Sequence, residues 1–430
     1  MAGGGGVQGF WQGRKGLVIL LVGLALVAGL TWVLNRQVGA DDEGDSLRHL
    51  VEVIALVRTQ YVEPVSTLDL IAAYTETGSI NGMLAKVLND PYTHFLDPRA
   101  YQQTQIDIGR TYGGLGIYVG MRDDQLTVIA PIPGTPAQQA GLQAGDRIVG
   151  IDGQPTELMS QDEAGSLTRG EVGATVVIQA ERGRGDEVQR LTFEIVREEI
   201  EVPSVTKKAV LDGDDLPFLG STRLGYVQLS SFNERTTAEV RAAVREVLQG
   251  GAQGLLLDLR NNPGGLLTAS IEVADLFLED GPIVHVVNRD QRRFTYRAEG
   301  AGTFPRVPMV VLVNQFSASA SEIVSGALQD RGVATLVGTT TFGKGLVQTV
   351  IPLSGGAGLS LTTGRYQTAG GRFIHETGIE PDVAVPVDDE TQQQINQWLT
   401  ESELHLEDPQ LQKALEILRD MVVAGARQAA

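Results

Sequence analysis

The spacing of hydrophobic residues changes character several times along the chain. Between 45 and 101, apolar positions such as Leu50, Ile54 and Val57 recur three or four residues apart, which predicts amphipathic helices. From about 105 to 200 the pattern becomes short β-branched runs separated by Gly, Pro and Asp-Gly. This second pattern predicts a compact β-rich domain.

Strand and helix patterns then alternate between about 203 and 385. Apolar runs at Gly254 to Leu259 and Met309 to Val313 predict buried strands, and the stretches Thr237 to Leu248 and Glu322 to Leu328 have helical periodicity. Such alternation is typical of an α/β core.

These changes predict a multidomain α+β protein. We expect a membrane anchor or signal segment, a helical domain, a β-rich domain, an α/β core and a helical tail. The corresponding residues are 1–40, 41–102, 103–200, 201–388 and 389–430.

An uncharged apolar run spans 17–34, behind Arg14 and Lys15. The basic flank predicts a membrane-targeting segment whose amino terminus stays inside. The run is long for a signal peptide and short for a spanning helix, and Val38 with Ala40 would suit a cleavage site. We expect an uncleaved anchor in the inner membrane, with the rest of the chain on the periplasmic side of the cell envelope.

Composition excludes several classes of function. The formal net charge of -19 at pH 7 argues against a nucleic-acid partner, because phosphate binding needs clustered basic residues. The chain has no cysteine, which excludes disulfides, zinc thiolate sites and a thiol nucleophile.

The stretch GTTTFGKG at 338–345 matches the Walker A nucleotide loop except at its last position, where Gly345 replaces Ser or Thr. A phosphate loop also needs a following helix, whereas LVQTVIPL predicts a strand. We therefore reject a nucleotide site and look for another role for Lys344. On a strand, Gln348 would point the same way as Lys344.

A candidate nucleophile lies upstream, in the run SASAS between a predicted strand and a predicted helix. Ser319 and Glu322 fit the capping box S-x-x-E, which is a purely structural explanation. However, three serines alternating with alanines supply more hydroxyls than one cap requires. One of these serines is therefore expected to be available for chemistry.

A serine nucleophile needs a base. The five histidines are scattered and no G-x-S-x-G motif occurs, although the partners of a Ser-His-Asp triad need not be adjacent in sequence. A Ser-Lys pair is an established variant. Lys344 would have to lose its proton near neutral pH, so its pKa must fall by roughly 3 units from about 10.4, which burial can achieve.

The stretch LLLDLRNNPGGLL at 255–267 runs from a hydrophobic strand into two glycines. It is either an ordinary turn or one half of an oxyanion hole, because glycines let backbone N–H groups face a bound group. The other half would be the amide after the nucleophile.

Three stretches, LDLRNNPGG, N-x-x-SASASE and TFGKGLVQ, follow one another in this order behind the β-rich region. Together they resemble the carboxyl-terminal processing (tail-specific) serine peptidases. The resemblance covers essentially the whole chain after the apolar run. It implies a crotonase-like (ββα) protease core behind a PDZ domain, with no metal or organic cofactor.

The resemblance also assigns roles to single residues. The central serine of SASAS, Ser319, matches the nucleophile of the family, and Lys344 matches its general base. Gln348 is similar to the residue that positions the lysine, and Glu322 matches an acidic position important to activity.

The oxyanion-hole amides implied by the resemblance belong to Gly265 and Ala320. Asn261 replaces the glycine or other small residue that is frequent before N-P-G-G in the family. This departure leaves the conformation of the loop open.

The segment YGGLGIYV at 112–119 resembles the carboxylate-binding loop of PDZ domains, and 134–153 continues the resemblance through a helix and a hairpin. Such loops bind the terminal carboxylate of a peptide through backbone N–H groups. A generic Gly-rich hairpin is the alternative. The matching positions are Gly114, Leu115, Gly116 and Ile117, and Arg169 lies where some members make a gating contact.

The combined expectation is a serine endopeptidase that captures protein carboxyl-terminal tails. The expected partners are proteins with accessible tails and the membrane, with a homodimer suggested by the terminal helices. Two alternatives remain open at this point. One is a catalytically silent PDZ-type tail-binding or scaffold protein, and the other is a non-proteolytic enzyme, because related cores host acyl-thioester chemistry.

Overall fold

The computed structural model describes residues 43–429, apart from 110, 123, 124, 133, 158, 160, 184–187, 202 and 402. The predicted membrane segment at 17–34 and the cleavage positions Val38 and Ala40 lie outside the described residues. Within the described part of the chain, no helix combines the length and apolarity needed to cross a membrane.

The chain divides into two compact units. The first comprises residues up to 101 together with 348–362, and the second comprises 102–347 and the residues from 363 onward.

Helices dominate the first unit, as the periodicity predicts. They are α2 (Glu43–Gln60), α3 (Thr67–Thr77) and α4 (Ile80–Leu88), followed by the short strand β1 (His94–Leu96). β1 pairs antiparallel with the beginning of β18 (Gly358–Thr368). The fully buried apolar side chains of this unit include Val53, Val57, Leu70, Met83, Leu84, Leu359 and Leu361.

The helix α5 (Pro98–Gly109) precedes a β-rich region in the second unit. There β2 (Thr111–Gly114) pairs with β9 (Glu198–Glu201), and the strands between them form a sheet in the order β3-β4-β5-β7-β8, with β6 paired to β5. β3 is therefore an edge strand. The bounds are β3 (Ile117–Arg122), β4 (Gln125–Pro131), β5 (Arg147–Ile151), β6 (Gln154–Pro155), β7 (Thr175–Arg182) and β8 (Gln189–Val196), with helices α6 (Pro136–Gln139) and α7 (Gln161–Thr168).

A six-stranded sheet forms the α/β core, in the order β10-β11-β12-β15-β16-β19. β10 is antiparallel to β11, and the remaining neighbours are parallel. Every residue of β12 and β15 is buried, as is expected when both faces of a parallel sheet are covered. The bounds are β10 (Val205–Leu211), β11 (Leu224–Leu229), β12 (Gly254–Asp258), β15 (Met309–Val313), β16 (Thr335–Gly338) and β19 (Val383–Ala384).

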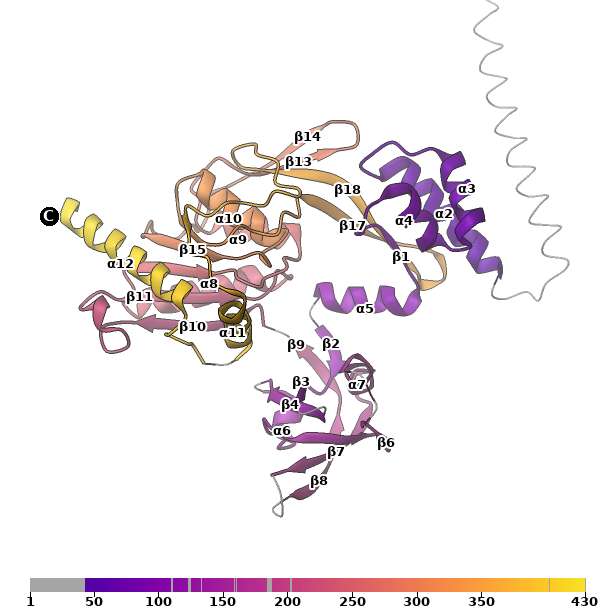
Figure 1. Ribbon diagram of the computed structural model, residues 1–430, viewed down its shortest axis with the longest axis horizontal. Coiled ribbons are helices and arrows are strands. Elements are labelled where there is room, and N and C mark those ends of the chain that lie inside the picture. Colours follow the sequence, from indigo (N-terminus) through magenta and orange to yellow (C-terminus); the bar gives the residue numbers. More distant parts are fainter. Residues whose placement is uncertain are drawn as a thin grey trace, which may run out of the picture. The chain divides into compact units, whose positions relative to one another are not determined.

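Helices cover both faces of this sheet (Figure 1). On one face Leu257 and Val311 pack with α8 (Thr236–Gln249), α9 (Leu267–Asp275) and α10 (Ala320–Asp330). On the other face the alternate residues, such as Leu256 and Val310, pack against α12 (Pro409–Ala429). The helix α11 (Asp389–Thr400) precedes α12, and both lie in the region predicted as a helical tail.

The remaining strands are β13 (Pro282–Asn288) and β14 (Arg293–Arg297), which pair with each other, and β17 (Leu346–Pro352). The second half of β18 pairs with β13, and β17 also pairs with β18. The mixed α/β multidomain fold is thus confirmed, while the domain boundaries stay predictions.

The topology brings three loops together. β12, β15 and β16 are parallel neighbours, so their carboxyl ends lie at the same edge of the sheet. The loops that follow these strands contain the Gly-Gly stretch, the SASAS run and Lys344.

The buried face of α12 should contribute strongly to stability. Leu418 is fully buried against the sheet, so Leu418→Ala should lower the free energy of unfolding by about 2–5 kcal/mol through lost apolar contact and a cavity. Urea unfolding followed by circular dichroism measures this. On the same helix Lys413 is exposed and makes only a surface ion pair with Glu416, so Lys413→Ala should cost less than about 1 kcal/mol. Equal costs would contradict the packing described for α12.

Candidate active site

Ser319 stands at a strained turn between a strand and a helix. β15 ends at Val313, and α10 begins at Ala320 immediately after the serine. The φ angle of Ser319 is 53°, which is uncommon for a residue other than glycine. Strain of this kind persists only where the surroundings enforce it, and it clusters at functional sites.

The neighbouring serines are committed to structural hydrogen bonds. The Ser317 hydroxyl donates to the carbonyl oxygen of Leu259 at 2.8 Å, and the Ser321 hydroxyl donates to that of Asn262 at 2.9 Å. The Ser319 hydroxyl donates a hydrogen bond to none of the residues that the structure describes. Ser319 is thus the serine of the SASAS run whose proton is available.

The buried carboxylate of Glu322 connects Ser319 to the Lys344 loop. Its Oε2 atom accepts the backbone N–H of Ser319 at 2.8 Å and that of Lys344 at 2.9 Å. Its Oε1 atom accepts the Thr341 hydroxyl at 2.6 Å and the Gly343 N–H at 2.8 Å. The bond to Ser319 is the one expected of a capping box, but the other three serve the neighbouring loop. A single side chain therefore fixes both backbone segments.

Burial raises the pKa of Glu322, while its four hydrogen bonds act in the opposite direction. Tyr366, from β18, bonds to the same two chain segments as Glu322. Its hydroxyl donates to the carbonyl oxygen of Ser319 at 3.1 Å, and its N–H donates to that of Gly345 at 3.0 Å. Burial, together with the nearby Glu322, raises the pKa of Tyr366 well above its usual value, so the hydroxyl keeps its proton. No sequence pattern points to Tyr366, because it lies on a distant strand outside the three motifs.

The Lys344 loop does not form a phosphate cradle. A strand, β17, follows the loop, and the N–H groups of Gly343 and Lys344 already face the Glu322 carboxylate. A bound phosphate would meet a buried carboxyl group at the same donors. The structure thus agrees with the rejection of a nucleotide site.

Lys344 itself is half-buried and lies two residues before β17, rather than on the strand. The reason is that its N–H is taken by Glu322 instead of by a neighbouring strand. Gln348 lies on β17, and its Nε2 atom is buried without a hydrogen-bond partner among the described residues. The expected common face of Lys344 and Gln348 therefore does not follow from strand geometry, and the role of Gln348 stays a prediction.

The two glycines after Pro263 are required by close contacts. Gly264 has φ +100°, and a Cβ atom there would lie 2.7 Å from the Ala318 oxygen and 2.8 Å from Cβ of Ser319. A Cβ atom on Gly265 would lie 2.0 Å from the Phe232 oxygen. The glycine loop therefore lies directly against the segment Ala318 to Ala320.

Two backbone N–H groups beside Ser319 are available. The Gly264 N–H donates to Asn262 at 2.9 Å, whereas the N–H groups of Gly265 and Ala320 donate to none of the residues described. Unused donors of this kind on both sides of a nucleophile are what an oxyanion hole requires.

Asn261 has a backbone conformation that is compatible with glycine at this position. Its φ angle is 57°, a left-handed conformation that glycine adopts freely and asparagine tolerates better than most residues. Its Oδ1 accepts the Asn314 side-chain amide at 2.7 Å, and its own N–H donates to Asn314 Oδ1 at 3.0 Å. The substitution therefore keeps the backbone conformation and adds a tie to the SASAS loop.

Three histidines, His49, His285 and His405, make side-chain hydrogen bonds away from Ser319. Among the described residues, none is hydrogen-bonded to Ser319. His285, for example, bonds with Thr295 and with the carbonyl oxygen of Ala369, and burial lowers its pKa. This disfavours the Ser-His-Asp alternative.

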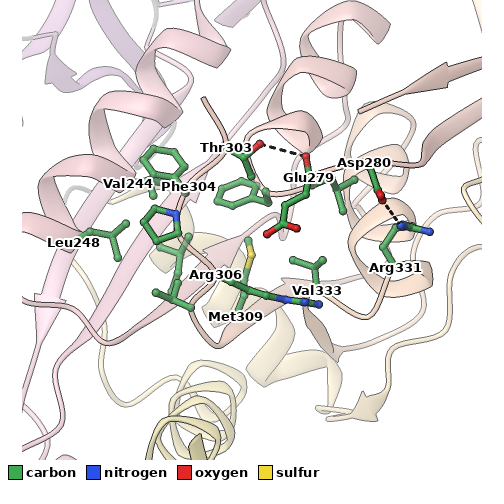
Figure 2. Close-up of a pocket in the computed structure, with 15 residues that line it drawn as sticks. Val244, Leu248, Glu279, Asp280, Thr303, Phe304, Arg306, Met309, Arg331 and Val333 are labelled. Carbon is green, nitrogen blue, oxygen red and sulfur yellow. Dashed lines mark hydrogen bonds and ion pairs between the residues drawn. The ribbon is translucent and has the colours of Figure 1, made fainter. Parts of the chain in front are cut away.

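A cavity of about 150 Å³ opens elsewhere on the core, lined by residues that include Leu248, Phe304 and Val333 (Figure 2). Two further lining residues, Leu255 and Met309, lie at the amino-terminal ends of β12 and β15. The cavity is thus at the opposite end of the strands from Ser319. It does not belong to the candidate active site.

In the predicted carboxylate-binding loop, backbone carbonyl groups have hydrogen-bond partners and backbone N–H groups are available. The carbonyl oxygens of Leu115 and Gly116 accept the N–H groups of Ala137 at 2.9 Å and Ile132 at 2.8 Å. The N–H groups of Leu115 and Gly116 donate to no described residue. Gly114 ends β2 and Ile117 begins the edge strand β3, so the four predicted positions form the connection between these strands.

Arg169 directly follows α7 and is exposed. The adjacent end of the helix is held by the buried Arg197, whose Nη2 atom donates to the carbonyl oxygen of Leu167 at 2.8 Å. A gating role for Arg169 stays a prediction.

Comparisons with known proteins agree with this arrangement. Family models match at residues 223–385 for peptidase family S41 and at 127–182 for the PDZ domain. A carboxyl-terminal-processing protease from Picosynechococcus sp. is 36% identical over 434 residues, which cover 97% of this chain and 98% of that protein. The chain belongs to the carboxyl-terminal-processing proteases of peptidase family S41.

Another carboxyl-terminal-processing protease, from Synechocystis sp., is 42% identical over 309 residues, covering 71% of this chain and 70% of that protein. The solved structure of a photosystem II D1 C-terminal processing protease is similar, with a TM-score of 0.52 and 32% identity over 84% of this chain and 98% of that one. The family and the serine-peptidase activity predicted from the motifs are therefore confirmed.

The contacts around Gly264 predict a large effect of one methyl group on this protease. Gly264→Ala should lower kcat by about 100-fold or more, because the added Cβ would push the glycine loop away from Ser319 and Ala320. Steady-state cleavage of an unstructured protein substrate measures this.

The matched control is Gly332→Ala. Gly332 also has a positive φ of +64°, but a Cβ atom there would meet nothing within 4 Å. The control carries the backbone strain without the collision, so its kcat should be unchanged. An equal loss in both variants would attribute the effect to strain alone.

Proposed function

We propose that Ser319 is the nucleophile and Lys344 its general base, with the N–H groups of Gly265 and Ala320 as the oxyanion hole. The observation that carries this assignment is the Glu322 carboxylate, which accepts the N–H groups of both Ser319 and Lys344. The two unused amides beside Ser319 support it independently.

The chemistry follows from these positions. Neutral Lys344 takes the proton of the Ser319 hydroxyl as its oxygen attacks a peptide carbonyl carbon. The negative charge that develops on the carbonyl oxygen is stabilised by the N–H groups of Gly265 and Ala320. Lys344 then returns a proton to the leaving amine, and water hydrolyses the acyl-enzyme. No metal or organic cofactor is required.

In this proposal Glu322 positions the backbone of Ser319 and of Lys344. Its four donors are three backbone N–H groups and the Thr341 hydroxyl, so its lone pairs hold the main chain of the two loops. Gln348, on β17, is proposed to orient the Lys344 amine.

The β-rich domain is proposed to bind the carboxyl-terminal tail of a protein substrate. The N–H groups of Leu115 and Gly116 would bind the terminal carboxylate, and the tail would extend the sheet along the edge strand β3. Arg169, which follows α7, is proposed to make a gating contact that makes the protease core respond to a tail bound in the β-rich domain.

We further propose that residues 17–34 anchor the chain in the inner membrane, with the protease on the periplasmic side. The basic residues Arg14 and Lys15 support this orientation. Substrates would be envelope proteins with accessible tails, and the terminal helices suit a homodimer.

Two single variants test the dyad. Ser319→Ala and Lys344→Ala should each reduce cleavage of an unstructured protein with an apolar carboxyl terminus by about 10⁴-fold or more, because each removes a partner of the same step. Cleavage is followed by gel and mass spectrometry with the purified full chain. Ser325→Ala, at a buried serine that bonds to the Ser321 carbonyl oxygen, should stay active.

Full cleavage by either dyad variant would end the Ser-Lys assignment. Tail binding without turnover by the unmodified chain, under any condition, would instead support the scaffold alternative.

A third variant tests tail recognition. Gly116 has φ +76°, and a Cβ atom there would lie 2.4 Å from Cβ of Thr135. Gly116→Ala should therefore weaken binding of a peptide with a free carboxyl terminus by about 10-fold or more, measured by fluorescence anisotropy.

Gly134→Ala is the matched control, because Gly134 has φ +80° but open space around its Cβ position. Its peptide affinity should be unchanged. The proposed carboxylate site would be contradicted if Gly116→Ala bound the peptide as tightly as the unmodified chain does. It would also be contradicted if the unmodified chain bound the peptide amide as tightly as the peptide with a free carboxyl terminus.

A further inference from the structure

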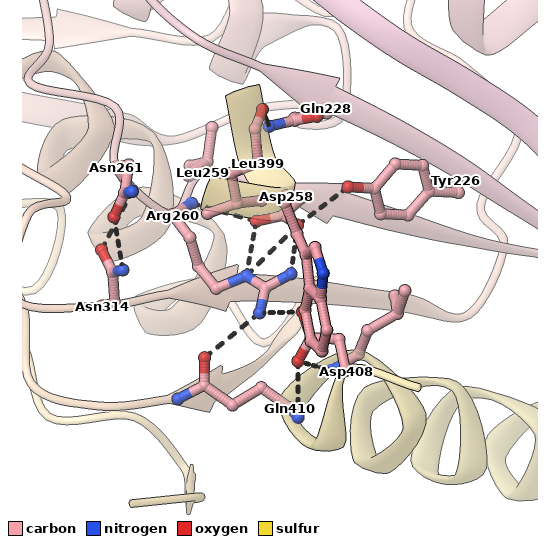
Figure 3. Close-up of polar contacts among 12 residues, drawn as sticks. Tyr226, Gln228, Asp258, Leu259, Arg260, Asn261, Asn314, Leu399, Asp408 and Gln410 are labelled. Carbon is pink, nitrogen blue, oxygen red and sulfur yellow. Dashed lines mark hydrogen bonds and ion pairs between the residues drawn. The ribbon is translucent and has the colours of Figure 1, made fainter. Parts of the chain in front are cut away.

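Arg260 belongs to the loop 259–265, which contains Gly265 and is called the oxyanion loop below, and its side chain is almost completely buried. It is 2% exposed and follows β12 by two residues. Figure 3 shows its guanidinium group surrounded by Asp258, Asp408 and Gln410. A buried guanidinium requires several acceptors, because its charge loses the solvation of water.

Asp258, at the end of β12, supplies the first acceptors. Nε of Arg260 donates to Asp258 Oδ1 at 3.0 Å, and Nη2 donates to Oδ2 at 2.7 Å. The Tyr226 hydroxyl donates to the same Oδ2 at 2.9 Å. Burial disfavours the charged form of Arg260, but Asp258 and Asp408 outweigh this effect and raise its pKa.

The second group of acceptors comes from the carboxyl-terminal tail, about 150 residues later. Nη1 of Arg260 donates to Asp408 Oδ2 at 2.7 Å and to Gln410 Oε1 at 3.2 Å, across sequence separations of 148 and 150 residues. Asp408 also caps α12, because its Oδ1 accepts the N–H of Gln410 at 2.9 Å and that of Leu411 at 3.2 Å. Asp408 therefore uses one oxygen for its helix and the other for Arg260.

The neighbouring helix α11 makes a similar contact with the next residue of the loop, Asn261. Nδ2 of Asn261 donates to Asn396 Oδ1 at 3.0 Å, and Gln392 donates to the same oxygen at 2.8 Å. The end of α11 is fixed to the sheet by Lys207, whose Nζ donates to the Trp398 carbonyl oxygen at 2.7 Å.

The next residue transmits this position to the catalytic loops. Asn262 is fully buried, and its Oδ1 accepts the Gly264 N–H at 2.9 Å. Its carbonyl oxygen accepts the Ala318 N–H at 3.0 Å and the Ser321 hydroxyl at 2.9 Å. Three consecutive residues, 260 to 262, thus connect the tail to both sides of the candidate oxyanion hole.

We propose that the carboxyl-terminal tail positions the oxyanion loop of the protease, with Asp408 and Gln410 fixing Arg260 and Asn396 fixing Asn261. The inference rests on the proposed roles of Ser319, Gly265 and Ala320. Asp408, Gln410 and Asn396 are positioning residues, since they act through the loop.

Ordinary packing does not account for this arrangement. α12 already has an apolar face, with Leu411, Ala414, Leu415 and Leu418 buried against the sheet. Replacing a buried ion pair by apolar residues is often neutral or stabilising, so two buried carboxylates and an arginine are not needed for stability alone. They fix a geometry that apolar contacts leave adjustable.

The test is Asp408→Asn in the full chain. Asparagine caps helices as well as aspartate does, so α12 keeps its cap. The amide nitrogen then faces the Arg260 donor instead of an accepting oxygen. The expected result is a kcat lower by about 10-fold with KM unchanged. The oxyanion loop is displaced, whereas the binding of the substrate's carboxyl terminus to the β-rich domain stays the same.

The matched control is Asp388→Asn. Asp388 caps α11 through the Thr391 N–H at 2.8 Å, and it has no hydrogen bond to the loop 259–265. This control should keep the kcat of the unmodified protease. Gln410→Ala and Asn396→Ala, which each remove one neutral hydrogen bond to the loop, should lower kcat by about 3-fold.

The outcomes separate the two levels of the proposal. Activity in Ser319→Ala would overturn the proposed function itself. An inactive Ser319→Ala variant, together with unchanged kcat in Asp408→Asn, Gln410→Ala and Asn396→Ala, would overturn only the positioning role. An equal loss in Asp388→Asn, a rise in KM alone, or unfolding of Asp408→Asn and Gln410→Ala would also overturn it.

Discussion

The buried carboxylate of Glu322 is the interaction on which the arrangement of the site depends. Two chain segments that are more than twenty residues apart meet at its oxygens, one ending at Ser319 and the other containing Lys344. Its four donors offset part of the loss of water, and a polar group inside a protein needs such partners. Without this acceptor, three N–H groups and a hydroxyl would lose their partner. The two loops are also joined by the Phe342 N–H, which donates to the carbonyl oxygen of Ser317, and by the two hydrogen bonds of Tyr366.

Much of the fold follows from local sequence. The apolar runs of β12 and β15 are buried on both faces and have few alternatives to a parallel sheet. The motifs around Ser319, Lys344 and the two glycines locate the candidate site, because strand order brings the loops after neighbouring strands together.

The long-range partners are not foreseeable in the same way. Tyr366 and Asp408 lie far along the chain from the residues that they contact, and helical or strand periodicity carries no information about such pairs. Lys344 shows a different limit. Its alternation with Gln348 suits a strand, but a hydrogen bond to Glu322 competes with the strand ladder and keeps Lys344 in the loop. Tertiary contacts override local preference at the site itself.

The proposed binding of a terminal carboxylate by the N–H groups of Leu115 and Gly116 has a consequence for turnover. A loop that recognises a terminal carboxylate binds the original end of the substrate, and after cleavage that end belongs to the excised fragment. The shortened protein carries a new terminus and is free to leave. In the proposed function the fragment keeps the recognised group, so it would compete with the next substrate until it dissociates or is degraded.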